Sequence, residues 1–116
     1  MGDKTRGGVY KSISELVGNT PLVELTNYEK ANELEAAIIG KLEYFNPLSS
    51  VKDRIALSMI EAAEASGKLP KDTQIVEGTS GNTGIGLAAR AAAKGYQVRV
   101  AVLGNGSEER LKIMRA

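Results

Sequence analysis

The residue best suited to covalent chemistry is a lysine at the start of a predicted helix. Residues 46–54 read N-P-L-S-S-V-K-D-R, and the break at the proline places Lys52 in the first helical turn. The amide end of a helix carries a partial positive charge, so a cation there costs roughly a few tenths of a kcal/mol. An amine whose protonated form is disfavoured is suited to attack a carbonyl carbon, as a Schiff-base lysine does.

Two other interpretations of Lys52 stay open on these residues alone. In the first, Ser50 and Asp53 form a capping-box-like pair at the helix start, and Lys52 and Arg54 are solvated. In the second, Lys52 is a point charge for a phosphate group, although no P-loop accompanies it. A helix dipole supplies at best about 2 of the about 4 kcal/mol needed to bring a lysine to near-neutral pKa, so burial or a cofactor must supply the remainder.

A second stretch that could bind a ligand is the glycine-rich loop at residues 77–86, E-G-T-S-G-N-T-G-I-G. One interpretation is a strand-to-helix turn in which Ser80 or Asn82 caps the following helix. The other is an anion site, made by backbone N–H groups at the helix start together with the hydroxyls of Thr79, Ser80 and Thr83. The loop offers more polar groups than a single cap requires, and this favours the anion site.

The same loop contains a weak match to a nucleotide-binding pattern. Gly84, Gly86 and Ala89 satisfy G-x-G-x-x-A, but about six loop residues separate the first glycine from the strand. The acidic residue expected about twenty positions later is replaced by L-G-N at residues 103–105. We therefore reject a dinucleotide site, and no Gly-Lys-Ser/Thr follows to make a Walker A loop.

Composition limits the remaining chemistry. The chain has 116 residues, 15 basic and 14 acidic, with a net charge of +1, so no bulk field favours nucleic acid or an anionic membrane. Cysteine and histidine are absent, which removes disulfides, thiolate ligands and the commonest metal ligand, and we expect no metal site. No apolar stretch is long enough to span a bilayer or to act as a signal sequence, so we expect a soluble, cytoplasmic protein.

The predicted elements place both stretches in an α/β fold. Residues 1–11 are expected to be a flexible N-terminus, and Ser12 with Glu15 fits a capping box. We predict strands at 22–25, 37–44, 73–77 and 97–103, and helices at 12–17, 51–66, 85–94 and from 107 onward, with a weakly helical link at 28–35. The alternation after Ser50 predicts a parallel sheet with flanking helices.

Three motifs taken together strongly resemble cysteine synthase (O-acetylserine sulfhydrylase), a family of fold type II pyridoxal-phosphate enzymes. They are G-N-T-P-L-V-E-L at 18–25, K-L-E-Y-F-N-P-L-S-S-V-K-D-R at 41–54 and E-G-T-S-G-N-T-G-I-G-L-A at 77–88. The resemblance runs from about Ser12 to Val102. It implies that Lys52 holds pyridoxal 5'-phosphate covalently and moves protons in catalysis. It also implies that Thr79, Ser80, Gly81, Asn82 and Thr83 bind the substrate carboxylate, with Asn82 contacting the 3'-oxygen of the cofactor.

The implied reaction is a β-replacement in which sulfide displaces acetate from O-acetyl-L-serine to give L-cysteine. The family also implies a homodimer and a serine acetyltransferase partner. Thr83 stands where serine and threonine dehydratases usually carry histidine, which favours the cysteine synthase branch. A haem-free cystathionine β-synthase and an O-phosphoserine sulfhydrylase remain open alternatives.

The resemblance also has departures. The family's Met-Pro-Glu-Thr-Met-Ser segment is replaced by L-G-N-G-S-E-E at residues 103–109, and its later phosphate-binding loop has no counterpart in these residues. We therefore expect an incomplete fold type II architecture: residues 12–45 as large-domain strands and residues 46–116 as part of the small mobile domain. A piece of an active enzyme is one expectation. The rival is a non-catalytic fragment that acts by self-association or by pairing with another chain.

Overall fold

The computed structural model describes residues 7–79, 81–102, 104 and 107–116. Along the chain the elements are η1 (Ile13–Leu16), β1 (Leu22–Glu24), α1 (Thr26–Ala31), β2 (Ile39–Lys41), η2 (Glu43–Phe45), α2 (Lys52–Ala65), β3 (Gln74–Gly78), α3 (Asn82–Lys94), β4 (Gln97–Ala101) and α4 (Glu108–Arg115). Every predicted element is present. The largest difference is at the strand predicted for residues 37–44, which is shortened to β2 because residues 43–45 form the 3-10 helix η2. Helix α3 begins three residues earlier than expected, at Asn82.

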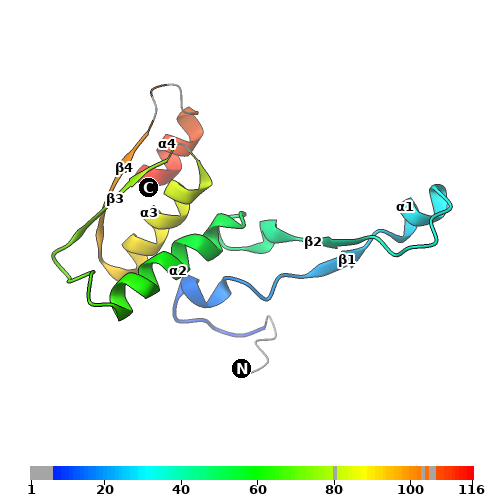
Figure 1. Cartoon of the computed structure of the whole chain (residues 1–116), viewed down its shortest axis with the longest axis horizontal. Coiled ribbons are helices and arrows are strands. Elements are labelled where there is room, and N and C mark those ends of the chain that lie inside the picture. Colours follow the sequence, from blue (N-terminus) through cyan, green and yellow to red (C-terminus); the bar gives the residue numbers. More distant parts are fainter. Residues whose placement is uncertain (1–6, 80, 103, 105–106) are drawn as a thin grey trace.

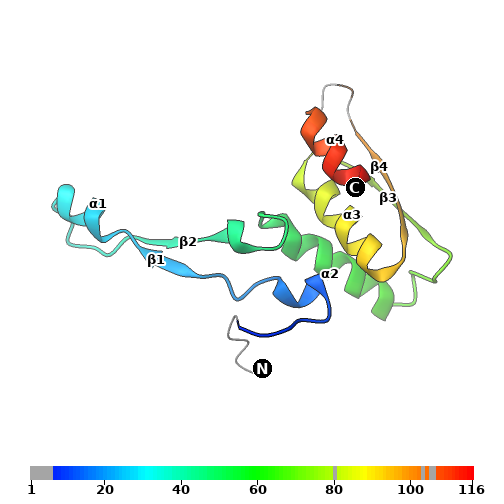
Figure 2. The ribbon, with the colours of Figure 1, turned by 180° about the vertical axis from the view of Figure 1, so that it is seen from behind.

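The chain divides visibly into two regions (Figure 1). We call residues 22–41, which form β1, α1 and β2, the arm, and residues 52–115, which form α2 to α4, the body. The arm is an antiparallel hairpin whose register pairs Leu22 with Lys41 and Glu24 with Ile39. It projects away from the body in both views (Figures 1 and 2), and the extents of the molecule are 57 × 41 × 25 Å.

The body contains the expected parallel α/β unit. Strands β3 and β4 pair in parallel from Gln74 with Gln97 to Gly78 with Ala101, and α3 connects them. Helix α3 ends at Gly95, whose φ of +80° is a left-handed conformation that glycine adopts without steric cost. This strand–helix–strand unit confirms the parallel sheet that the sequence predicted.

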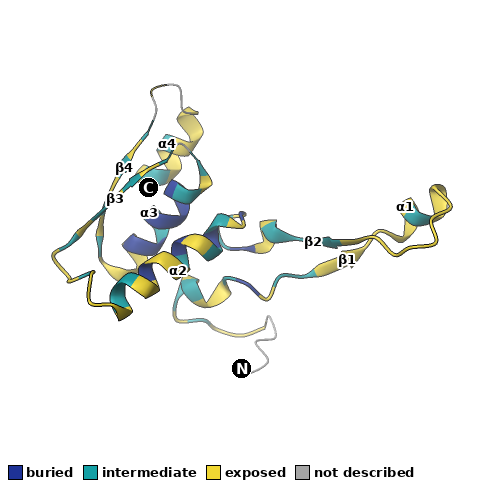
Figure 3. Ribbon diagram, in the orientation of Figure 1, coloured by how far each residue is buried: buried dark blue, intermediate teal, exposed yellow. Residues whose placement is uncertain are grey.

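The core lies between α2 and α3. Ala56, Ile60 and Leu87 are its buried residues, and Leu69, Ile75 and Tyr96 pack around them. Colouring by burial shows the buried positions concentrated on these two helices, whereas the arm is almost entirely exposed (Figure 3). The predicted site therefore lies on the best-packed part of the chain, because Lys52 begins α2 and Asn82 begins α3.

The apolar residues of α2 do not all lie on its buried face. Val51, Ile55 and Met59 are spaced four residues apart but are 46 %, 40 % and 43 % exposed. The face that packs against α3 instead carries Ala56 and Ile60. Small side chains allow the two helices to approach closely, and this decides which face of an apolar helix is buried.

Candidate active site

The turn before Lys52 is held by two hydrogen bonds between residues close in sequence. The Oγ of Ser50 accepts from the N–H of Lys52 at 3.1 Å, and the Oδ2 of Asp53 accepts from the N–H of Leu48 at 2.7 Å. Ser49 has a φ of +60°, a left-handed conformation that is uncommon for a residue with a side chain. The predicted capping pair is therefore not formed: the N-cap residue of α2 is Val51, which has no side-chain cap, and Asp53 accepts from Leu48 instead of closing a box with Ser50.

The side chain of Lys52 is available for chemistry. It is partly buried, and within the described residues its ammonium takes part in no ion pair, unlike Lys41 and Lys94. Arg54, two residues later, is not solvated as one interpretation had it. It donates from Nε and Nη2 to the two carboxylate oxygens of Glu43 at 3.1 and 3.2 Å.

The predicted anion site lies at the start of α3. Gly81 is the N-cap residue and no side chain among the described residues caps this end of the helix. Thr79 Oγ1 accepts from the N–H of Gly81 at 3.2 Å, which orients the loop, while Asn82 is exposed and Thr83 is half-buried. Ser80 lies outside the described residues. The start of a 13-residue helix without a side-chain cap has N–H groups and a positive dipole end that favour a negatively charged ligand.

Close packing between the two helices brings Lys52 next to this loop. A methyl group at Gly86 would lie 2.9 Å from the Cβ of Ala56 and 3.3 Å from the carbonyl oxygen of Lys52. Gly86 stands four residues, about one turn, after Asn82. The backbone of Lys52 therefore packs against the first turns of α3. The structure brings Lys52 to the same end of the helix pair as Thr79, Gly81, Asn82 and Thr83.

Gly84 and Gly86, which match the G-x-G-x-x-A pattern, are explained by close packing. A methyl group at Gly84 would lie 2.7 Å from Cγ2 of Thr79, 3.1 Å from Cε of Met114 and 3.2 Å from Cγ1 of Val100. Gly84 thus lets α3 contact the loop, the sheet and α4 at one point. The structure supplies a physical reason for both glycines that does not involve a dinucleotide.

Sequence reasoning missed the network that joins the arm to the body. We call Thr20, Glu43, Asn46 and Arg54 the junction. Asn46 is buried; its side chain donates to Glu43 Oε2 at 2.7 Å and accepts from the N–H of Gly18 at 3.0 Å. Arg54 also donates to Thr20 Oγ1 at 2.6 Å. The hydrogen bonds from Arg54 lower the pKa of Glu43 from 4.5 to about 2.

A buried pair of opposite charges, also missed, lies beside the lysine. Asp53 is 0 % exposed and Arg90 is 1 % exposed. Burial raises the pKa of Asp53 and lowers the pKa of Arg90, and the charge of each opposes the shift of the other. The sequence offered one indication that Arg90 is buried. It lies three residues after Leu87 and four after Gly86, which places it on the same, buried face of α3.

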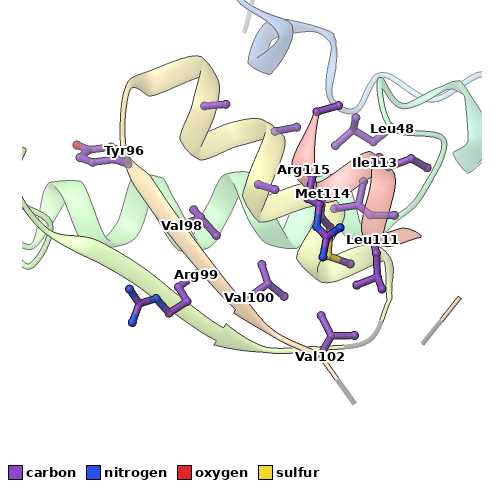
Figure 4. Close-up of a pocket in the computed structure, with 15 residues that line it drawn as sticks. Leu48, Tyr96, Val98, Arg99, Val100, Val102, Leu111, Ile113, Met114 and Arg115 are labelled. Atoms are coloured by element: carbon purple, nitrogen blue, oxygen red, sulfur yellow. The ribbon is translucent and has the colours of Figure 1, made fainter. Parts of the chain in front are cut away.

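An apolar groove of about 780 Å³ lies between α3, β4 and α4, on the side of α3 that does not pack against α2. Figure 4 shows Val98, Val100 and Val102 along one wall, with Leu111 and Met114 of α4 opposite. None of the described residues of the predicted site lines this groove. Within the described residues no cluster of acidic side chains could hold a metal ion, and no helix has the length and apolar content needed to cross a bilayer.

Comparison with known proteins gives a consistent result. A family model described as pyridoxal-phosphate dependent enzyme matches residues 13–116. The chain is 50 % identical to a cysteine synthase of Flavobacterium sp. over 92 % of its own length and 34 % of that protein. It is 46 % identical to the cystathionine beta-synthase of Saccharomyces cerevisiae over 90 % of its length, 21 % of that protein.

Solved structures agree. The chain superposes on the cysteine synthase of Entamoeba histolytica with a TM-score of 0.88 and 41 % identity, covering 99 % of this chain and 35 % of that one. The chain therefore spans about a third of the length of the cysteine synthases that it matches. Its α/β architecture is the corresponding third of a fold type II enzyme.

Proposed function

Because the chain belongs to the family of pyridoxal-phosphate dependent enzymes, we propose that it carries part of the active site of a cysteine synthase. The reaction is the β-replacement of O-acetyl-L-serine by sulfide, which forms L-cysteine and releases acetate. One observation carries the proposal. The Lys52 amine forms no ion pair with a described residue, and its backbone packs against Gly86, one turn from the uncapped start of α3.

The described residues fit the cofactor. Pyridoxal 5'-phosphate needs an amine that can bond to its aldehyde carbon, and Lys52 offers one that no described carboxylate neutralises. It also needs polar partners, and the side-chain amide of Asn82 would hold its 3'-oxygen from the exposed first position of α3. When bound, the cofactor supplies an electron sink for the charge that develops at the substrate Cα.

The chain's own residues then have distinct roles. The N–H groups at the start of α3, with the hydroxyls of Thr79, Ser80 and Thr83, bind the substrate carboxylate, and Gly81 lets the backbone approach it. Nζ of Lys52 takes the proton from the substrate Cα as acetate leaves, and it returns that proton after sulfide has added to Cβ. The rigid turn at residues 48–51 limits the positions from which Lys52 can do this.

The similarity to cystathionine beta-synthase supports a second candidate, since 46 % identity does not separate the two branches. In that case a thiol amino acid, not sulfide, would add to Cβ. An O-phosphoserine donor is a further variant of the same reaction. For the whole protein we propose small-molecule substrates, a homodimer, serine acetyltransferase as a partner and a cytoplasmic location.

Cofactor binding is the direct test. Pyridoxal phosphate is added to the chain, the yellow absorbance of a lysine-bound cofactor is recorded, and borohydride reduction followed by mass spectrometry locates the modified residue. We expect modification at Lys52 and its loss in Lys52→Ala. Lys68→Ala is the matched control, because Lys68 is exposed and lies beyond the opposite end of α2. A band that survives Lys52→Ala contradicts the assignment.

Turnover separates the remaining alternatives. The chain is incubated with O-acetylserine and either sulfide or homocysteine, and the amino-acid products are measured. Cysteine supports the first candidate and cystathionine the second. Neither product and no cofactor band would favour the non-catalytic fragment, whose association with itself is then read by light scattering.

A further inference from the structure

Asp53 and Arg90 are two buried charges whose remaining polar atoms are complementary. Asp53 uses Oδ2 for the N–H of Leu48, and Arg90 uses Nη1 for the Oγ of Ser14 at 3.0 Å. Oδ1 of Asp53 and Nε and Nη2 of Arg90 have no partner among the described residues. One acceptor oxygen and two donor nitrogens therefore have no partner among the described residues, and they belong to side chains of opposite charge.

Neither charge would be tolerated in this core alone. An ionised group removed from water is strongly disfavoured unless an opposite charge or hydrogen bonds compensate it. The charge of Arg90 lowers the pKa of Asp53 and the charge of Asp53 raises the pKa of Arg90, although the described residues contain no direct ion pair between the two. Asp53 and Arg90 lie on two helices that pack closely, because a methyl group at Gly86 of α3 would lie 2.9 Å from the Cβ of Ala56 of α2.

The contacts of this pair form a path to Lys52. Ser14 lies in η1, Arg90 in α3 and Asp53 in α2, and Asp53 holds the N–H of Leu48 at the beginning of the turn. That turn, residues 48–51, ends at Lys52. It also contains Ser49 at φ +60°, a conformation that persists only where surrounding contacts enforce it.

We propose that Asp53 and Arg90 are positioning residues for Lys52. The buried charge couple holds residues 48–51 in the one geometry from which Lys52 presents its amine at the start of α3. The charge of Arg90 favours the ionised form of Asp53 against the effect of burial, and the ionised carboxylate makes the stronger bond to Leu48. This inference rests on the proposed role of Lys52, but the hold on the turn is measurable without any cofactor.

Hydrogen exchange at the Leu48 amide tests the hold on the turn. In Arg90→Met we expect this amide to exchange about tenfold faster, because a charge-assisted bond is weakened, while amides in the middle of α2 keep their rates. Arg90→Lys should restore most of the protection. Arg99→Met makes the same chemical change at an exposed arginine of β4 and should have no effect. An unchanged Leu48 rate in Arg90→Met overturns the proposal.

The pH dependence of lysine modification tests positioning as opposed to general stability. The rate at which pyridoxal phosphate is trapped on Lys52 by borohydride should fall about tenfold in Arg90→Met and recover in Arg90→Lys. Asp53 is faced by Arg90 from α3 and by the Leu48 N–H, and Arg90 is faced by Glu61 of α2 and Ser14 of η1. Without the cation, only the Leu48 N–H opposes the effect of burial on the pKa of Asp53. Arg90→Met should therefore gain an ionisation that the double variant Asp53→Asn, Arg90→Met lacks.

The outcomes remain separable. If the unmodified chain binds no pyridoxal phosphate, the proposed function fails, and the Leu48 exchange rate alone decides this inference. If circular dichroism shows that Arg90→Met does not fold, Asp53→Asn replaces it, since that change keeps the shape of the side chain and removes its charge. The proposal is overturned if Arg90→Met slows the trapping of pyridoxal phosphate on Lys52, Arg90→Lys does not restore the rate, and the pH profile shows no new ionisation. In that case the pair has only a structural role.

Discussion

The arm and the body are both regular, hydrogen-bonded structure, but they are stabilised differently. The arm closes on itself through backbone bonds, including Leu25 N–H to the oxygen of Ile38 at 2.9 Å and Leu34 N–H to the oxygen of Glu29 at 3.0 Å. None of the residues of β1, α1 or β2 is buried. The body adds a packed core to its hydrogen bonds. Regular structure alone therefore does not show where the stability of this chain resides.

The largest effect should come from emptying the core of the body. Leu87→Ala removes a side chain that is 1 % exposed, and we expect it to cost about 2–5 kcal/mol in the free energy of unfolding. Ile39→Ala makes a similar truncation in the arm, where Ile39 is 60 % exposed, and should change that free energy by less than about 0.5 kcal/mol. Urea denaturation measures both. If the two variants lost equal free energy of unfolding, Ile39 would have to be buried in solution, and the contrast between the arm and the body would not hold.

A smaller effect should follow from forcing α2 and α3 apart. Gly86→Val places atoms where even a methyl group lies 2.9 Å from Ala56, and we expect a loss of about 1–3 kcal/mol. Gly78→Val is the matched control, because a side chain at Gly78 meets nothing within 4 Å and valine suits a strand. Urea midpoints of the two variants give the comparison. A tolerated Gly86→Val would show that the helices can separate without loss.

The smallest effect concerns the junction and its response to acid. The folded chain lowers the pKa of Glu43 from 4.5 to about 2, so ionised Glu43 stabilises the fold above pH 4.5 and this contribution is lost as pH falls toward 2. Glu43→Gln should flatten the pH dependence of unfolding in that window. Glu64→Gln is the counterpart in the body, since Lys94 and Tyr96 lower the pKa of Glu64 in the same direction.

Asp53 contributes with the opposite sign. Its pKa is raised in the folded chain, so its contribution to stability falls as pH rises through that pKa. Asp53→Asn should remove this opposing slope.

The Glu43 prediction fails if Glu43→Gln leaves the pH dependence of unfolding between pH 4.5 and 2 unchanged. The junction then does not support the fold, and the arm is attached by its backbone alone.

The sequence predicted the elements well because their signals are local. The Ser12–Glu15 capping box of η1, the glycine stops at Gly67 and Gly95 and the cap at Ser107 all act within a few residues. The buried face of α2 was less accessible to prediction. Its sequence is apolar on two faces, and the close approach of Gly86 on the neighbouring helix favours burial of the face that carries Ala56.

The candidate site shows the same limit. Lys52 and the loop at residues 79–83 could be identified because short motifs contain them, and their roles stay predictions. The residues that hold them in place pair over long separations: Glu43 with Arg54 across 11 positions, Gly18 with Asn46 across 28 and Ser14 with Arg90 across 76. No local pattern encodes such pairs, although Arg90 on an otherwise apolar helix face was a visible anomaly.

The projecting arm also changes how this molecule behaves in solution. Its radius of gyration is 17.6 Å, whereas a compact globule of this length has about 13 Å. An elongated particle diffuses more slowly and elutes earlier from a sizing column than a sphere of equal mass. A single 12.3 kDa chain would therefore run as a heavier species, and its state of association has to be read from a direct mass measurement, not from its elution position.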